Sequence, residues 1–247
     1  METAELITSL VREGQLLAAA ATRTDPATPV PTCPGWQMRD LLRHIGMVHR
    51  WATAFVAEGH EEFRAAVPEN DLDGNELIEW FREGHGLLVG ALTESPADVR
   101  CWTFLPAPSP LAFWARRQAH ETAIHRADAE SALSGKPGPV PADFAVDGIA
   151  ELLTGFHGRT RSRLRSEAPR ALRVRPLDTD DVWTMWISTD APRTEPIAEV
   201  AADCELIGTA EQLYLTLWNR LPLSTVTVTG DTGLAREWQE KSAVTWS

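Results

Sequence analysis

The chain has 247 residues, which is enough for one large domain or two small ones, and its hydrophobic fraction of 43% can supply a real core. A formal net charge of −12 disfavours binding to nucleic acid or to an anionic membrane surface. Segment 1–21 is amphipathic and has no basic region at its start, so we expect neither a signal peptide nor a membrane span there.

The chain contains three cysteines, Cys33, Cys101 and Cys204, which are far apart and form no CxxC motif. An odd number of dispersed cysteines is typical of a reduced chain, so we predict a cytoplasmic protein without disulfides. Cys33 lies in a Pro-Gly turn, and we interpret it as structural rather than as a nucleophile.

Residues 1–133 are predicted to form a four-helix bundle. Apolar periodicity indicates helices over residues 3–21, 37–57, 75–92 and 110–132, the last opened by Ser109 as N-cap followed by a proline. In the second helix an inward-facing stripe steps by three and four residues and consists of Leu41, His44, Val48, Trp51 and Phe55.

The segment "SGKPGPVPAD", residues 134–143, holds three prolines and two glycines and is the predicted domain boundary. Residues 144–247 then predict a small α+β domain. We expect a helix over 144–165, a helix over 209–218 opened by a capping box, and a final helix in "GLAREWQE". An antiparallel sheet is expected from the strands "ALRVRPL", "VWTMWIS", "ADCELIG" and "STVTVTG".

The fourth helix carries the charged stretch "RRQAHETAIHRADAE", residues 116–130, which contains a candidate metal site. Glu121 and His125 are four residues apart, about 40° on a helical wheel, so both side chains can hold one ion. His44 lies in the apolar stripe of the second helix and supplies a third ligand. Three protein ligands and an open fourth position are the arrangement of a catalytic zinc site.

Several alternatives remain open on spacing alone. His44 by itself is typical of a hydrogen-bonded core histidine, and His85 also faces inward and is a rival ligand. The Glu121/His125 pair lies on the surface if the opposite face of the helix, with Ala112, Ala115, Ala119 and Ala123, is the buried one. His120 lies about 100° from Glu121 on the wheel and faces elsewhere.

The segments "VPTCPGW", "RDLLRHIG", "RRQAHETAIHRADAE" and "ELIGTAEQLYLTLWNRLP" together resemble the mycothiol-dependent maleylpyruvate isomerase family, in order and over nearly the whole chain. The resemblance implies a DinB-like four-helix bundle that binds a divalent metal, typically zinc, followed by a domain similar to sterol-carrier-type α+β domains. The family's ligand positions match His44, Glu121 and His125, and the arginine implicated in its activity matches Arg220.

This resemblance implies a metal-bound thiolate of mycothiol that attacks an electrophilic small molecule, as an isomerase or an S-transferase. Arg220 would pair with a substrate carboxylate, and Arg82 and Arg117 are weaker candidates for that role. Two alternatives are a non-catalytic protein that binds an apolar small molecule and a hydrolase that uses zinc-bound water without a thiol.

Overall fold

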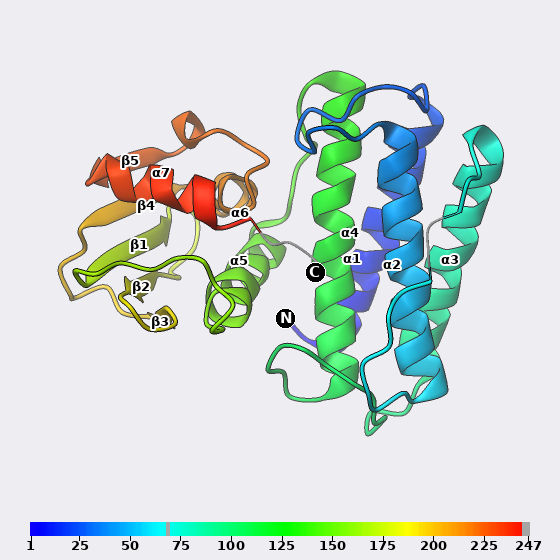
Figure 1. Ribbon diagram of the computed structural model, residues 1–247, viewed down its shortest axis with the longest axis horizontal. Coiled ribbons are helices and arrows are strands. Elements are labelled where there is room, and N and C mark those ends of the chain that lie inside the picture. The colour runs from blue at the N-terminus through cyan, green and yellow to red at the C-terminus, as the bar shows by residue number, and fades with distance from the viewer. Residues whose placement is uncertain (68–69, 244–247) are drawn as a thin grey trace. The chain divides into compact units, whose positions relative to one another are not determined.

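The computed structural model of the protein describes residues 1–67 and 70–243. The chain forms two compact units, Met1–Gly138 and Pro139–Ser247, and the division between them falls within the proline- and glycine-rich segment 134–143. Figure 1 labels the helices and strands of both units. In the part of the chain that is described, no helix has both the length and the apolar character needed to cross a bilayer.

The described part of the N-terminal unit contains four long helices, as predicted, and Figure 1 shows them side by side. They are α1 (Thr3–Thr22), α2 (Met38–Glu58), α3 (Gly74–Glu94) and α4 (Pro110–Ser134). Gln37 and Asp40 form a reciprocal capping box at the start of α2, and Ser109 Oγ accepts the Ala112 N–H at the start of α4. Gly59 ends α2 in the left-handed conformation, with a φ of 65°. Glycine adopts this conformation at little cost in free energy because it has no Cβ.

The core of this unit forms where the apolar stripes of the helices meet. Helix α1 packs mainly on α4, α2 packs mainly on α3, and α4 also contacts α2. On α2 the predicted stripe faces inward, since Leu41, Val48 and Phe55 are all at most 6% exposed. Burial of one such side chain contributes about 1.5–3 kcal/mol, so this stripe fixes which face of α2 turns toward α4 and the candidate site.

Helix α4 is buried on both of the faces that the sequence left as alternatives. Ala115, Ala119 and Ala123 on one face are at most 1% exposed, and their small side chains permit the close approach of another helix. On the other face Glu121 and His125 are 5% and 7% exposed. The alanine face and the polar face of α4 are therefore both buried, and burial of one does not expose the other.

Arg126, another charged residue of the stretch 116–130, is also buried and paired. Arg126 of α4 donates to Glu13 of α1 at 2.7 Å and to Glu130 at 2.6 Å. Both Arg126 and Glu13 are fully buried. Removing one member of such a network leaves an uncompensated charge, so this group ties α1 to α4 without contributing to the candidate site.

The C-terminal unit is a five-stranded sheet with helices, which confirms the predicted α+β class. Its described elements are α5 (Ala142–Ala150), a π-helical turn (Glu151–Phe156), β1 (Arg170–Pro176), β2 (Trp183–Ile187), β3 (Arg193–Glu195), β4 (Cys204–Gly208), α6 (Ala210–Leu217), a 3-10 turn (Leu223–Thr225), β5 (Thr227–Gly230) and α7 (Thr232–Lys241). The strand order is β3-β2-β1-β4-β5.

Three details of this unit differ from the sequence expectation. The sheet is mixed rather than antiparallel, because β4 pairs with β1 in parallel; Asp203 holds this register by donating its N–H to the Ala171 carbonyl and accepting the Ala171 N–H on its carboxylate. The helix predicted over 144–165 ends at Phe156, where the His157 N–H donates to the Leu152 carbonyl in a wide turn. Strand β3 was not expected, since three residues are too short to show a periodicity.

Candidate metal centre

The candidate site lies between α2 and α4, each of which directs part of its inward face at the other. His44 comes from α2, and Glu121 and His125 come from one face of α4. His44 Nε2 lies 3.6 Å and His125 Nε2 lies 3.4 Å from the same atom, Glu121 Oε1. One ligand atom from each of the three residues lies within 4.8 Å of the other two, so a single ion can reach all three.

Glu121 Oε1 carries the clearest sign that a cation belongs here. This oxygen is buried and has no hydrogen-bond partner, and the two imidazole nitrogens that face it are too distant for normal hydrogen bonds. A buried acceptor without a partner costs about 1–3 kcal/mol, and more when it is charged. Two imidazoles and one carboxylate are a donor set that zinc accepts, and a divalent ion among them would satisfy the oxygen.

The charge of Glu121 is set by its neighbours. Burial raises the pKa of this carboxyl. The imidazoles of His125 and His44 and the guanidinium of Arg117 lower the pKa by more than burial raises it, so that it lies well below its usual range. Arg117 Nη2 lies 3.1 Å from Glu121 Oε2, the oxygen that does not face the imidazoles. Glu121 is therefore a carboxylate at neutral pH, with one oxygen held by Arg117 and the other available to a ligand.

His125 is held from its other side by a second carboxylate of the same helix. Its Nδ1 lies 2.9 Å from Asp128 Oδ2, while its Nε2 faces Glu121. Burial lowers the pKa of His125, but the contacts with Asp128 and Glu121 outweigh it and raise the pKa to about 9. An imidazole with a carboxylate on one nitrogen and a metal on the other is a recurrent arrangement at zinc sites.

The proline-rich loop between α1 and α2 supplies the wall of the site. The Trp36 indole lies with its centroid 5.0 Å from the His44 ring and 6.1 Å from the His125 ring, stacked on the latter. Thr32 Oγ1 and Cys33 Sγ both donate to the Asp128 carboxylate, at 2.5 Å and 3.3 Å. Cys33, His125 and Asp128 also meet within 4.8 Å, as a second group with metal-ligand chemistry.

Sequence reasoning did not find the roles of Trp36, Thr32 and Asp128. The spacing of Asp128, three residues after His125, is the one signal that places it beside the imidazole. Nothing in the sequence of the loop gives its position, because an irregular segment has no periodicity from which a facing side can be read.

The rival ligand His85 lies elsewhere in the bundle. Its ring packs on His49 and Phe81, at centroid distances of 5.3 Å and 6.1 Å, and its tip fills the space that a side chain at Gly14 would need. Neither His85 nor His120 belongs to a ligand group among the described residues. Burial lowers the pKa of His85, which is the behaviour of a neutral core histidine.

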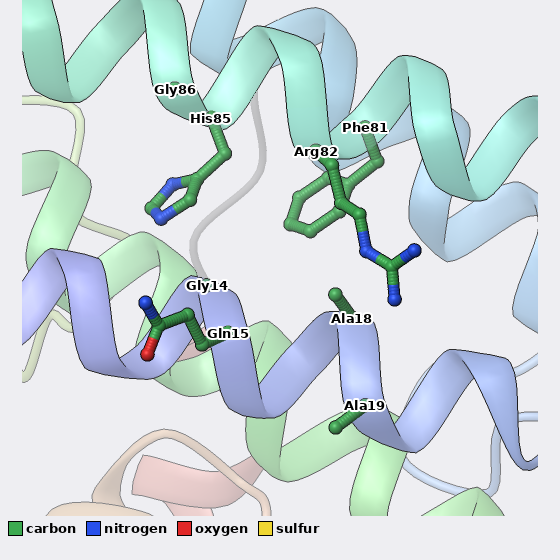
Figure 2. Close-up of a pocket in the computed structure, with 8 residues that line it drawn as sticks. All are labelled: Gly14, Gln15, Ala18, Ala19, Phe81, Arg82, His85 and Gly86. Carbon is green, nitrogen blue, oxygen red and sulfur yellow. The ribbon is translucent and has the colours of Figure 1, made fainter.

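A groove of about 350 Å³ lies between α1 and α3, and Figure 2 shows His85 and Phe81 directed from α3 toward α1 across it. Arg82 also lines this groove. Its guanidinium pairs with the exposed Glu79 one turn away and donates to Thr22 Oγ1. The lining is mostly small and apolar, so we interpret the groove as a surface feature of the helix packing.

Arg220 belongs to the C-terminal unit and follows the end of α6. Asn219 before it has a φ of 59°, the left-handed conformation that often ends a helix, and its side-chain amide donates to the Gln239 carbonyl. The Arg220 N–H donates to the Leu215 carbonyl, and its Nη1 donates to the Trp218 carbonyl at 2.8 Å. The turn after α6 therefore fixes the direction in which this side chain leaves the backbone.

Comparisons with known proteins point to one protein family for both units of the chain. The model of the mycothiol maleylpyruvate isomerase N-terminal domain matches residues 7–130, and that of the MDMPI C-terminal domain matches residues 143–237. The crystal structure of the mycothiol-dependent maleylpyruvate isomerase and that of a variant with one histidine replaced are similar in fold, with TM-scores of 0.65 and 0.67. Each is 14% identical to this chain, and each match covers 93% of both chains.

A ubiquinone synthesis protein, UbiJ-SCP2, overlaps 42% of the chain at 23% identity, but its TM-score of 0.29 is too low to carry an argument. No curated protein matches the chain.

Proposed function

Because the chain belongs to the mycothiol maleylpyruvate isomerase family, we propose that it is a metal- and thiol-dependent enzyme that isomerises an electrophilic small molecule or transfers the thiol to it. The observation that carries the proposal is the buried Glu121 Oε1, which lacks a hydrogen-bond partner and faces the imidazoles of His44 and His125. The proposed ion is zinc, for which two imidazoles, one carboxylate and an open position are a common catalytic set.

The residues around the ligands have separate roles in this proposal. His44, Glu121 and His125 hold the ion, and Arg117 keeps the Glu121 carboxylate ionised and oriented. Trp36 covers both imidazoles and excludes water from that side of the site. When bound, the ion and a low-molecular-weight thiol, mycothiol in this proposal, would supply a thiolate near neutral pH that can add to an electrophilic double bond and leave again.

The proposed substrate class is an electrophilic alkene that carries a carboxylate, with maleylpyruvate as the first compound to test. Addition of a thiol to a cis alkene leaves a single bond about which the adduct rotates, and loss of the same thiol then gives the trans isomer with no change in composition. In an S-transferase the thiol would stay on the product. Arg220 is proposed to pair with the substrate carboxylate, because a guanidinium binds such a group through two parallel hydrogen bonds.

The proposed location is the cytoplasm, which keeps a low-molecular-weight thiol reduced. Cys33, Cys101 and Cys204 carry thiols that are not joined in disulfides, as this setting requires.

The test is metal analysis of the purified protein followed by turnover of maleylpyruvate with and without mycothiol. We expect about one ion per chain and conversion only when the thiol is present. Glu121→Gln should lose the ion and the activity, whereas Glu79→Gln, which changes an exposed carboxylate, should keep both. Turnover of an ester or amide without any thiol would favour a hydrolase, and a stable complex with an apolar ligand in an ion-free protein would favour a binding protein.

A further inference from the structure

We infer that the loop between α1 and α2 is a positioning element of the site: Thr32 and Cys33 hold the Asp128 carboxylate in the orientation that keeps His125 ready to bind an ion. This inference rests on the proposed function, since it assigns a role to residues that do not themselves touch the ion. The inference assigns a structural role to the segment "VPTCPGW", residues 30–36, that its sequence alone does not indicate.

Asp128 is a fully buried carboxylate that at least three side chains approach as donors. Thr32 Oγ1 donates to Oδ1 at 2.5 Å, and His125 Nδ1 and Cys33 Sγ lie 2.9 Å and 3.3 Å from Oδ2. Because the donors approach both oxygens, the carboxylate cannot turn about its terminal bond without losing one of them. Thr32 and Cys33 both belong to the loop, so the loop helps to set where the oxygen that faces His125 lies.

The orientation of Asp128 decides which nitrogen of His125 can bind an ion. An imidazole that binds an ion carries one proton, and the acceptor at Asp128 Oδ2 keeps that proton on Nδ1. The lone pair is then on Nε2, the atom that faces Glu121 Oε1 at 3.4 Å. If Asp128 turned away, the ring could rotate about its side-chain bonds, and either nitrogen could carry the proton.

The loop can fix Thr32 and Cys33 because its backbone is itself held. The Val30 N–H donates to the Trp36 carbonyl, the Cys33 N–H donates to the Val30 carbonyl and the Trp36 N–H donates to the Cys33 carbonyl, all at 2.9–3.0 Å. Gly35 adopts a φ of 86°, which lets the chain turn back on itself. The same loop places the Trp36 indole on the His44 and His125 rings, so one segment supports the site from two sides.

The group formed by Cys33, His125 and Asp128 allows a competing arrangement, in which an ion binds there directly. The hydrogen-bond pattern favours the positioning role, because the Cys33 thiol donates to an acceptor that already serves Thr32 and His125. The two arrangements differ in what substitution of Cys33 does. A positioning thiol can be replaced at modest cost, whereas the loss of a ligand removes the ion.

The experiment measures the affinity for Zn²⁺ by competition with a chelator, together with the visible spectrum of the Co²⁺-loaded protein. Asp128→Asn and Thr32→Val should weaken Zn²⁺ binding by roughly tenfold to a hundredfold, as is usual for residues behind a metal ligand. Thr32→Ser keeps the hydroxyl donor and should restore both the affinity and the Co²⁺ spectrum. Cys33→Ala should have a smaller effect than Thr32→Val, and Thr93→Val, on an exposed part of α3, should have none.

Circular dichroism and thermal unfolding of the ion-free variants show whether each is folded, so that affinity is compared between folded proteins only. Wild-type affinity and spectrum in folded Asp128→Asn and Thr32→Val would overturn the inference while leaving the proposed metal site intact. Loss of the ion in Cys33→Ala with retention in His44→Ala would also overturn it, by moving the ion to the other group. A wild-type protein that binds no Zn²⁺ would overturn the proposed function and this inference together.

Discussion

In the described part of the N-terminal unit histidine rings pack together in two places, and only one of these has the chemistry of a metal site. Between α2 and α4, the His44 and His125 rings lie 5.0 Å apart and both face the Glu121 carboxylate. Elsewhere in the bundle the His49 and His85 rings lie 5.3 Å apart, and His49 Nε2 is hydrogen-bonded to the hydroxyl of Thr122 at 2.9 Å. The two pairs are similar in ring spacing, so spacing alone does not distinguish them.

The presence of a carboxylate separates the two groups. Burial and the neighbouring imidazole lower the pKa of His49, and burial lowers that of His85, so both are neutral at physiological pH. At the candidate site burial also disfavours a charged imidazole, but Asp128 and Glu121 raise the pKa of His125 to about 9. A cavity that keeps a positive charge on a buried ring is one that can accept a cation in place of a proton.

The largest expected effect is on metal content. His44→Ala, His125→Ala and Glu121→Gln should each weaken binding of the ion by at least roughly a hundredfold, because a three-ligand site is reduced to two ligands. His85→Gln and His120→Ala should keep the ion. Elemental analysis after dialysis against a weak chelator measures this, and equal loss in His120→Ala or His85→Gln would remove the distinction between the two groups.

Arg220 should matter for turnover and little for the ion. A charge-assisted contact with an anionic substrate contributes on the order of 2–5 kcal/mol, so Arg220→Ala should lower kcat/KM by roughly thirtyfold or more. Arg220→Lys keeps the charge but loses the two-pronged geometry and should also be impaired.

The matched control is Arg193→Ala, which changes an exposed arginine of the same unit and should be close to wild type. A folded Arg220→Ala variant with unchanged thiol affinity and turnover would show that the C-terminal unit does not contribute to the chemistry.

The affinity for the ion should rise with pH. The metal-free His125 ring has a pKa of about 9, so below that pH the ion must displace a proton from it. Glu121, with its pKa held well below the usual range, adds no proton release in this region. Affinity should therefore fall by about tenfold for each pH unit below 9 and level off above it. A competition titration at several pH values that gives a constant affinity between pH 6 and pH 8 would contradict this.

The smallest expected effect is on the free energy of unfolding of the ion-free protein. Its dependence on pH has opposite signs for the His49/His85 pair and for His125. For His49 and His85 the folded pKa is lowered, so the unfolded chain takes up more protons and stability is lost as pH falls below about 6.5. For His125 the folded pKa is raised, so its contribution is full below about 6.5 and is lost as pH rises toward 9.

Urea unfolding between pH 5 and pH 9 measures both slopes. The limit is about 1.4 kcal/mol per pH unit for each proton, hence about 2.8 for His49 and His85 together and about 1.4 for His125. His85→Gln should flatten only the acidic slope, and His125→Gln should flatten only the alkaline one. The same change in slope from both substitutions would mean that the two groups are not electrostatically distinct.

The sequence predicts the helices and the ligand candidates because both follow from a regular spacing. His44 belongs to a stripe of three- and four-residue steps on α2, and Glu121 and His125 are one turn apart on α4. The burial of both faces of α4 was not predictable, since an alanine face and a polar face each have a plausible exposed form. That both are covered depends on the packing of neighbouring helices.

The contacts that Thr32 and Cys33 make with Asp128 could not be predicted from the sequence either. Thr32 and Cys33 lie 96 and 95 residues before Asp128, and no local pattern links positions so distant. In the C-terminal unit the parallel pairing of β4 with β1 likewise depends on Asp203, whose backbone and side chain fix a register that strand propensity does not specify.

The most direct test of the central claim is X-ray absorption spectroscopy at the zinc edge, before and after addition of mycothiol. Before addition we predict two imidazole nitrogens and a carboxylate oxygen at about 2.0–2.2 Å and no sulfur; after addition one sulfur should enter at about 2.3 Å. A sulfur neighbour in the thiol-free protein would place Cys33 on the ion, and a spectrum unchanged by mycothiol would contradict the proposed thiol chemistry at His44, Glu121 and His125.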